Sequence, residues 1–123
     1  MQPNELFDQP DDAIQILLVD DHALFRSGIR SLLQRHPDCI VVGEAADGAE
    51  AVKRAQQLQP QVILLDLHMV GMSGLEVLHL IHQASPLSAV LMLTVSEATE
   101  DLTAALQAGA QGYLIKNMDA QDL

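Results

Sequence analysis

The sequence is poor in aromatic and basic residues. It has two Phe, one Tyr and no Trp among 123 residues, so it offers few of the aromatic platforms on which nucleic-acid bases stack. Six Lys and Arg stand against 17 Asp and Glu, a formal net charge of -11, and such a surface repels a phosphate backbone. If the whole protein contacts DNA, we expect a separate domain to do so.

Long apolar runs and paired cysteines are also missing. No stretch approaches the roughly 18 uninterrupted apolar residues of a membrane span, and residues 1–13 lack the basic and apolar regions of a signal peptide. Cys39 has no second cysteine for an intrachain disulfide, which fits a reducing compartment. We therefore expect a flexible tail over residues 1–13, one domain over residues 14–123, no membrane contact and a cytoplasmic location.

What the sequence does contain is a series of short aliphatic runs. Five have the length of a β-strand: Ile14–Val19, Ile40–Val42, Val62–Leu65, Ala89–Leu93 and Tyr113–Ile115. Segments of helical spacing lie between them, and strands that alternate with helices favour right-handed crossovers. The predicted fold class is therefore α/β, with five strands in a doubly wound parallel sheet that helices cover on both faces.

Four helices are predicted between the runs. Their apolar stripes, from the first helix to the fourth, are Phe25, Ile29, Leu32 and Leu33, then Val52 and Ala55, then Leu75, Leu78 and Ile81, then Leu102, Ala105 and Leu106. Ser73 and Glu76 form a capping box at the start of the third helix, and Gly109 suits the left-handed residue after the fourth. A fifth helix is expected to begin near Asp119.

Polar side chains stand at the carboxyl ends of these runs. They are Asp20 and Asp21 after the first, Asp66 after the third, Thr94 after the fourth and Lys116 after the fifth. Parallel strands present their ligands at these ends, so the five side chains should converge on one crevice. Three carboxylates repel one another unless a cation lies among them. Mg²⁺ prefers such oxygen ligands and is the predicted cofactor.

Asp66 can also act as a nucleophile. Carboxylates form acyl phosphates when a metal ion and an ammonium group neutralise the charge on the phosphoryl oxygens. Lys116 would supply the ammonium group and Thr94 a hydroxyl. Any one of these residues has an ordinary explanation at a strand end, such as capping a helix. Their combination favours a phosphoryl-accepting site.

These motifs resemble the receiver domain of two-component response regulators. The segments that carry the resemblance are Leu17–His22, Val42–Ala45, Ile63–Leu67, Gly71–Glu76 and Ala108–Leu114. Within that family they are similar to the NarL-like nitrate/nitrite regulators, which usually carry a C-terminal helix-turn-helix domain. The resemblance implies a flavodoxin-like (CheY-like) fold with strand order 2-1-3-4-5. It also implies that the full-length protein has a DNA-binding domain that is absent here.

The resemblance implies roles for the acidic residues. Asp66 would accept a phosphoryl group from a phosphohistidine on a sensor histidine kinase. Asp21, Asp66 and the backbone carbonyl of His68 would bind Mg²⁺ directly, and Asp20 would act mainly through water. The protein would then catalyse only its own phosphorylation and dephosphorylation and would not otherwise be an enzyme.

The resemblance also implies a switch. Thr94 and Tyr113 match the pair in which a hydroxyl moves to the phosphoryl group and the aromatic ring follows it inward, and Lys116 matches the lysine that binds a phosphoryl oxygen. Two positions depart from the family pattern, in which both carry proline. Val70 predicts a more mobile loop after the third strand, and Asn117 lacks the ring that makes a cis peptide bond inexpensive.

The histidines carry weaker predictions. His22 follows the acidic pair and is expected to cap the first helix. His79 and His82 are three apart on the third helix, but they lack the third ligand of a zinc motif. The side chain of His68, two residues after Asp66, is placed to tune the lifetime of the phosphoryl group.

Two alternatives stay open. Phosphatases of the haloacid dehalogenase type use an Asp nucleophile, Mg²⁺ and a lysine on a similar sheet, although their nucleophile ends the first strand. A stand-alone receiver would signal by protein contact without a DNA-binding domain. A chain that stops at Leu123 would leave apolar residues of one sheet face bare. We therefore expect either that the natural protein continues or that a homodimer covers this face.

Overall fold

The computed structural model describes residues 13–66, 69, 71, 73–94 and 99–115. Within them, strands and helices alternate: β1 (Ile14–Val19), α2 (Ala23–Leu33), β2 (Cys39–Ala45), α3 (Gly48–Leu58), β3 (Val62–Asp66), α4 (Gly74–Ala84), β4 (Ala89–Thr94), α5 (Thr99–Gln107) and β5 (Gly112–Ile115). The fifth helix expected near Asp119 and most of the expected tail lie outside the described residues. Ala13, assigned to that tail, is buried.

All neighbouring strands of the sheet are parallel, and their order is β2-β1-β3-β4-β5. The predicted fold class and strand order are confirmed. Strand β2 is longer than the predicted Ile40–Val42, because it continues through Gly43, Glu44 and Ala45. An edge strand is only half covered, so it needs no continuous apolar run.

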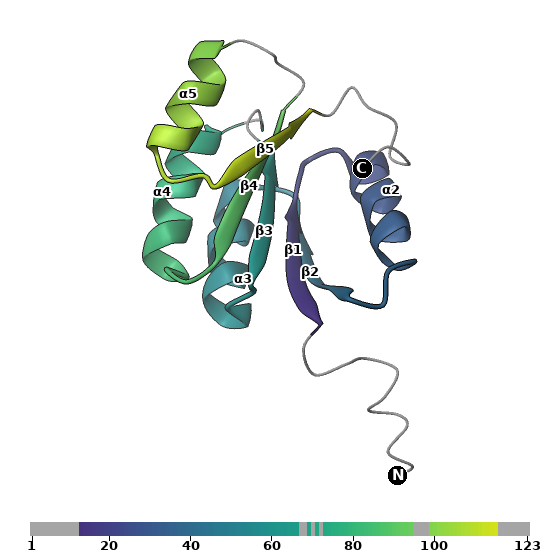
Figure 1. Ribbon diagram of the computed structural model, residues 1–123. Coiled ribbons are helices and arrows are strands. Elements are labelled where there is room, and N and C mark those ends of the chain that lie inside the picture. Colours follow the sequence, from purple (N-terminus) through teal and green to yellow (C-terminus); the bar gives the residue numbers. More distant parts are fainter. Residues whose placement is uncertain (1–12, 67–68, 70, 72, 95–98, 116–123) are drawn as a thin grey trace, which may run out of the picture.

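The strands send alternate side chains into two separate apolar clusters. Leu17 and Val19 of β1 join the cluster beneath α3, α4 and α5, whereas Ile16 and Leu18 join the cluster beneath α2. Figure 1 shows this arrangement, with α2 on one side of the sheet and the other three helices on the opposite side. The sheet is thus covered on both faces, as predicted, but unequally within the described residues.

Two helical faces differ from their predictions. Leu75 and Leu106 are partly exposed, 36% and 46% respectively, and do not belong to the buried faces of α4 and α5. The buried stripe of α4 instead contains Val77 beside Leu78 and Ile81, and α5 buries Ala105. A helical turn of 3.6 residues allows either set, so only packing against the sheet selects between them.

The predicted helix ends are present in α4 and after α5. Ser73 Oγ accepts a hydrogen bond from the backbone N–H of Glu76 at 3.2 Å. Gly109 has a φ of 111°, a conformation that favours glycine. None of the described helices is long and apolar enough to cross a membrane.

Candidate metal centre

Three carboxylates converge at the carboxyl end of the sheet. Asp20 directly follows β1 and Asp66 ends β3, and these two strands pair with Val19 opposite Leu65. One potential ligand atom from each of Asp20, Asp21, His22 and Asp66 lies within 4.8 Å of the other three. The structure therefore brings together the three acids that the sequence placed at strand ends.

Burial makes this cluster an unusual place for charge. Asp20 and Asp66 are 1% and 2% exposed, at the ends of strands whose other buried residues are aliphatic. Two carboxylates this deep lose hydration and repel each other, and both costs fall when a cation lies between them. A set of carboxylate oxygens beside solvent is also the donor set that hard divalent cations prefer. The residues present therefore fit a Mg²⁺ site.

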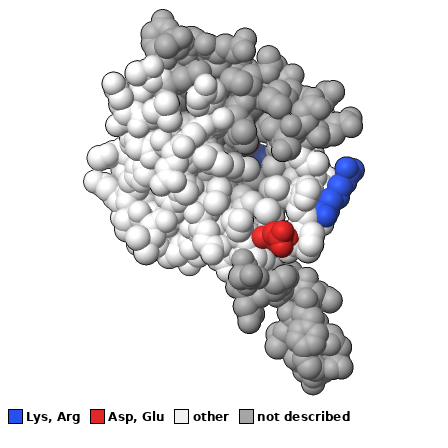
Figure 2. Space-filling view, in the orientation of Figure 1, with Lys and Arg blue, Asp and Glu red and all other residues white. Residues whose placement is uncertain are grey.

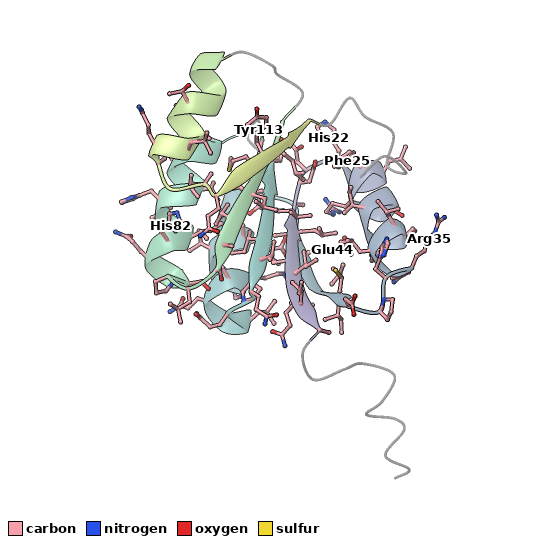
Figure 3. All side chains as sticks on the ribbon, viewed as in Figure 1. His22, Phe25, Arg35, Glu44, His82 and Tyr113 are labelled. Atoms are coloured by element: carbon pink, nitrogen blue, oxygen red, sulfur yellow. The ribbon has the colours of Figure 1, made fainter. Side chains whose placement is uncertain are left out.

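His22 makes side-chain contacts that the sequence did not predict. It stands at the N-terminal cap position of α2, but its side chain makes no capping hydrogen bond, so the expected capping role is wrong. Its Nδ1 instead lies 3.0 Å from Asp20 Oδ1, 3.2 Å from Asp21 Oδ1 and 3.9 Å from Asp66 Oδ2. The imidazole, 62% exposed, therefore lies at the mouth of the acidic cluster (Figure 3).

A group of charged residues holds the backbone beside this cluster. Arg26 of α2 donates from Nη1 to the carbonyl oxygen of Asp20 and from Nε to Glu44 Oε1, the latter at 3.2 Å. Arg30 donates to the other carboxylate oxygen of Glu44. This group was not predicted from the sequence, because it joins a helix to an edge strand across a sequence gap of 18 residues. One signal was available: Arg26 lies one helical turn after His22.

The remaining predicted residues are described only in part. Thr94 ends β4 and pairs with Ile115, one step beyond the pair of Asp66 with Leu93, so its backbone lies at the same edge of the sheet. Tyr113 of β5 is 43% exposed. The side chain of Thr94 lies outside the described residues, as do His68, Val70, Lys116 and Asn117.

His79 and His82 do not belong to the acidic cluster. His79 Nε2 lies 3.4 Å from Gln83 Nε2, on the exposed side of α4. The ring of His82 packs against Gly109 in the turn between α5 and β5, where an added Cβ would lie 2.5 Å from Nε2. Within the described part of the chain, the acidic cluster is the group of ligand-type side chains that could hold a metal ion.

Comparison with known proteins gives this cluster its family context. Residues 16–123 match the family model of the response regulator receiver domain. The chain belongs to this family. The acidic cluster and the order of the strands are therefore those of a receiver domain, and the match supports the two-component reading over the phosphatase alternative.

The relatives of this receiver domain include nitrate/nitrite regulators. NarL of Escherichia coli (strain K12) is 44% identical over 108 residues, which are 88% of this chain and 50% of NarL. NarP of the same organism is 47% identical over 109 residues, 89% of this chain and 51% of NarP. The signal receiver domain of NarL from Mycobacterium tuberculosis has a similar structure, with a TM-score of 0.82, 32% identity and coverage of 90% of this chain and 92% of that one. The chain spans about half the length of the two curated relatives.

Proposed function

We propose that this receiver domain is a switch that accepts a phosphoryl group on Asp66 from a sensor histidine kinase. The observation that carries the proposal is the burial of Asp66 at the end of β3 with ligand atoms of Asp20 and Asp21 within 4.8 Å. Asp21, Asp66 and the carbonyl of His68 would hold Mg²⁺ directly, and Asp20 would act mainly through water. A nucleophile beside a metal site is the arrangement that phosphoryl transfer requires.

The chemistry divides between the carboxylate and its surroundings. A carboxylate oxygen of Asp66 attacks the phosphorus of the phosphohistidine, the P–N bond breaks, and the electron pair of that bond returns to the imidazole. When bound, Mg²⁺ would supply positive charge against the phosphoryl oxygens. Burial of Asp66 excludes most water from the acceptor, and Lys116 would add an ammonium group on the phosphoryl side.

The switch follows from the new charge. A phosphoryl group adds about -1.5 to -2 charge and several acceptor oxygens, which would draw the Thr94 hydroxyl toward it. Tyr113, partly exposed on β5, would then turn into the space behind Thr94. Such a movement changes the surface formed by α5 and β5, and this surface would carry the signal to a partner.

The output is proposed to be transcription control in the cytoplasm, where response regulators usually act. The curated relatives are about twice as long as the matched region, which leaves room for a C-terminal helix-turn-helix domain. The net charge of -11 supports DNA contact through such a second domain and not through this one. A stand-alone receiver that signals through protein contact remains the second candidate, and sequencing the gene beyond Leu123 decides between the two.

Phosphorylation with a small phosphodonor tests the central claim. Acetyl phosphate with Mg²⁺ should label the parent chain, as seen by intact mass, whereas Asp66→Asn and a chelated sample should stay unlabelled. Asp47→Asn, an exposed acid at the start of α3, is the matched control and should be labelled like the parent. Full labelling of Asp66→Asn, or no effect of chelation, would contradict the assignment. Sustained turnover of soluble phosphate esters would instead support a phosphatase.

A further inference from the structure

Asp20, the first of the two neighbouring acids of the metal site, is held from several directions. The backbone N–H of Asp20 donates to the carbonyl of Ala45 at 3.0 Å, and its carbonyl oxygen accepts from Arg26. Asp20 Oδ1 accepts from the backbone N–H of His22 at 2.8 Å. The turn between β1 and α2 is therefore held by the edge strand on one side and by a helical side chain on the other.

The guanidinium that holds this carbonyl is itself held. Arg26 is 18% exposed and donates from Nε to Glu44, which is 25% exposed and also accepts from Arg30. Hydrogen bonds between charged groups are stronger than neutral ones, and they fix orientation best where partial burial limits competition from water. Glu44 immediately precedes Ala45 in β2, so the same short segment of strand holds the N–H of Asp20 directly and its carbonyl through Arg26.

We propose that Arg26, oriented by Glu44, is a positioning residue for the metal site. By holding the carbonyl oxygen of Asp20, it fixes the plane of the peptide between Asp20 and Asp21 and therefore the position of the Asp21 Cα from which the carboxylate extends. Mg²⁺ demands near-ideal octahedral geometry, so a carboxylate that wanders binds it poorly. The inference rests on the proposed function in one respect only, that these carboxylates bind a divalent cation.

Electrostatics and positioning predict opposite results when Arg26 is replaced. A positive charge near three carboxylates repels a cation, so its removal alone would tighten Mg²⁺ binding. Loss of an outer hydrogen bond that orients ligands typically weakens metal affinity by about 10–100-fold. The sign of the change therefore separates the two roles.

The experiment is a calorimetric Mg²⁺ titration of the full 123-residue chain and three variants. Arg26→Gln should raise the Mg²⁺ dissociation constant about tenfold or more, and Glu44→Gln should raise it by a smaller factor. Arg30→Gln is the matched control, because it removes the same charge from the same glutamate without touching Asp20. The side chain of Arg30 is 44% exposed, so we expect this variant to change the Mg²⁺ dissociation constant by no more than about twofold. If Arg26→Gln binds Mg²⁺ as tightly as the parent or more tightly, the proposal is wrong.

A second measurement needs no metal. In the metal-free chain, Arg26→Gln and Glu44→Gln should both shift the amide resonances of Asp21 and His22, whereas Arg30→Gln should leave them in place. Arg26→Lys, which keeps the charge, covers the case in which Arg26→Gln does not fold, and it should weaken Mg²⁺ binding less than Arg26→Gln. Unchanged Asp21 and His22 resonances in the Arg26 and Glu44 variants would overturn the proposal. A parent chain that binds no Mg²⁺ would contradict the proposed function, while the resonances would still decide the role of Arg26.

Discussion

The imidazole of His22 competes for the same oxygens that a metal ion would use. Its Nδ1 lies 3.0 Å from Asp20 Oδ1 and 3.2 Å from Asp21 Oδ1, so a cation that binds Asp21 directly and Asp20 through water must displace it. A net hydrogen bond contributes about 0.5–1.5 kcal/mol, so we expect His22→Ala to bind Mg²⁺ about two- to tenfold more tightly. His79→Ala, an exposed histidine on α4, is the control in the same titration. Weaker binding by His22→Ala would mean that the imidazole is itself a ligand.

Thr94 tests the coupling between the phosphoryl group and the output surface. We expect Thr94→Ala to accept a phosphoryl group but to switch incompletely. Moving a two-state equilibrium from 1:99 to 99:1 needs about 5.5 kcal/mol of differential stabilisation, and the variant would lack the hydrogen bond between the Thr94 hydroxyl and the phosphoryl group. The measurement is the set of amide shifts in α5 and β5 after saturation with a beryllium fluoride mimic. Thr103→Ala, an exposed threonine of α5, is the control. Equal amide shifts in the parent and in Thr94→Ala would show that the Thr94 hydroxyl plays no part in the switch.

The residues of the metal site were predictable from the sequence to different degrees. Asp20, Asp21 and Asp66 could be placed together because they follow strands that the aliphatic runs define. His22 could not, since the direction of its ring depends on the backbone of the turn before α2. The contact between Arg26 and Glu44 requires the relative placement of a helix and an edge strand, which no local pattern contains.

At the scale of single elements, the turn between α5 and β5 depends on two properties of Gly109. Its φ of 111° strains any residue with a side chain, and an added Cβ would lie 2.5 Å from His82 Nε2. Gly71 has a φ of 97° but nothing within 4 Å of an added Cβ. A substitution at Gly71 therefore introduces the backbone strain without the contact to a neighbouring side chain. Backbone strain of this kind costs about 1–3 kcal/mol.

We therefore expect Gly109→Ala to lower the free energy of unfolding more than Gly71→Ala does. Urea denaturation of both variants measures the difference, and Gly71→Ala should lose only the strain. Adding His82→Ala to Gly109→Ala should recover part of the loss, because the smaller side chain removes the contact. Equal losses in the two glycine variants would show that the ring of His82 moves aside without cost.

Helix boundaries were easier to predict than helix faces. Ser73 caps α4 through its side-chain hydroxyl and Gly109 ends α5 through its backbone conformation, so the start of α4 and the end of α5 could be predicted locally. Leu75 and Leu106 lie one residue or two from the truly buried positions, and a small rotation of the helix decides which of them meets the sheet. Packing of the whole helix sets that rotation, so the sequence pattern alone assigned both residues wrongly.

At the scale of the molecule, apolar side chains gather beside α2. The side seen in Figure 2 carries few charged side chains among its described residues. Between α2 and the sheet lies an apolar cavity of about 250 Å³. Its lining includes Ile14, Leu32, Leu33, Val62 and Leu91. The parallel α/β sheet could be predicted because strands and helices alternate along the chain, whereas the order of the strands was implied only by the family resemblance. How completely each sheet face is covered could not be predicted.

The cavity predicts how the chain responds to extension. The five aliphatic side chains named above are not fully buried. Four of them are partly buried, and Ile14 is 41% exposed. Full burial of one aliphatic side chain contributes about 1.5–3 kcal/mol. Because these five are already partly buried, covering them should add only a part of that sum, roughly 2–4 kcal/mol for all five together. We expect a chain extended through a fifth helix to gain this amount in urea denaturation and to remain a monomer by light scattering.

The 123-residue chain should reveal the same surface in another way. At high concentration we expect it to form a homodimer, because apolar side chains beside the cavity gain from contact with a second copy. Leu33→Ser and Val62→Thr should weaken that association, and Leu87→Ser, a nearly fully exposed leucine elsewhere, is the control. If the short chain stays monomeric and unfolds at the same urea concentration as the extended one, then a fifth helix is not needed to cover this face of the sheet.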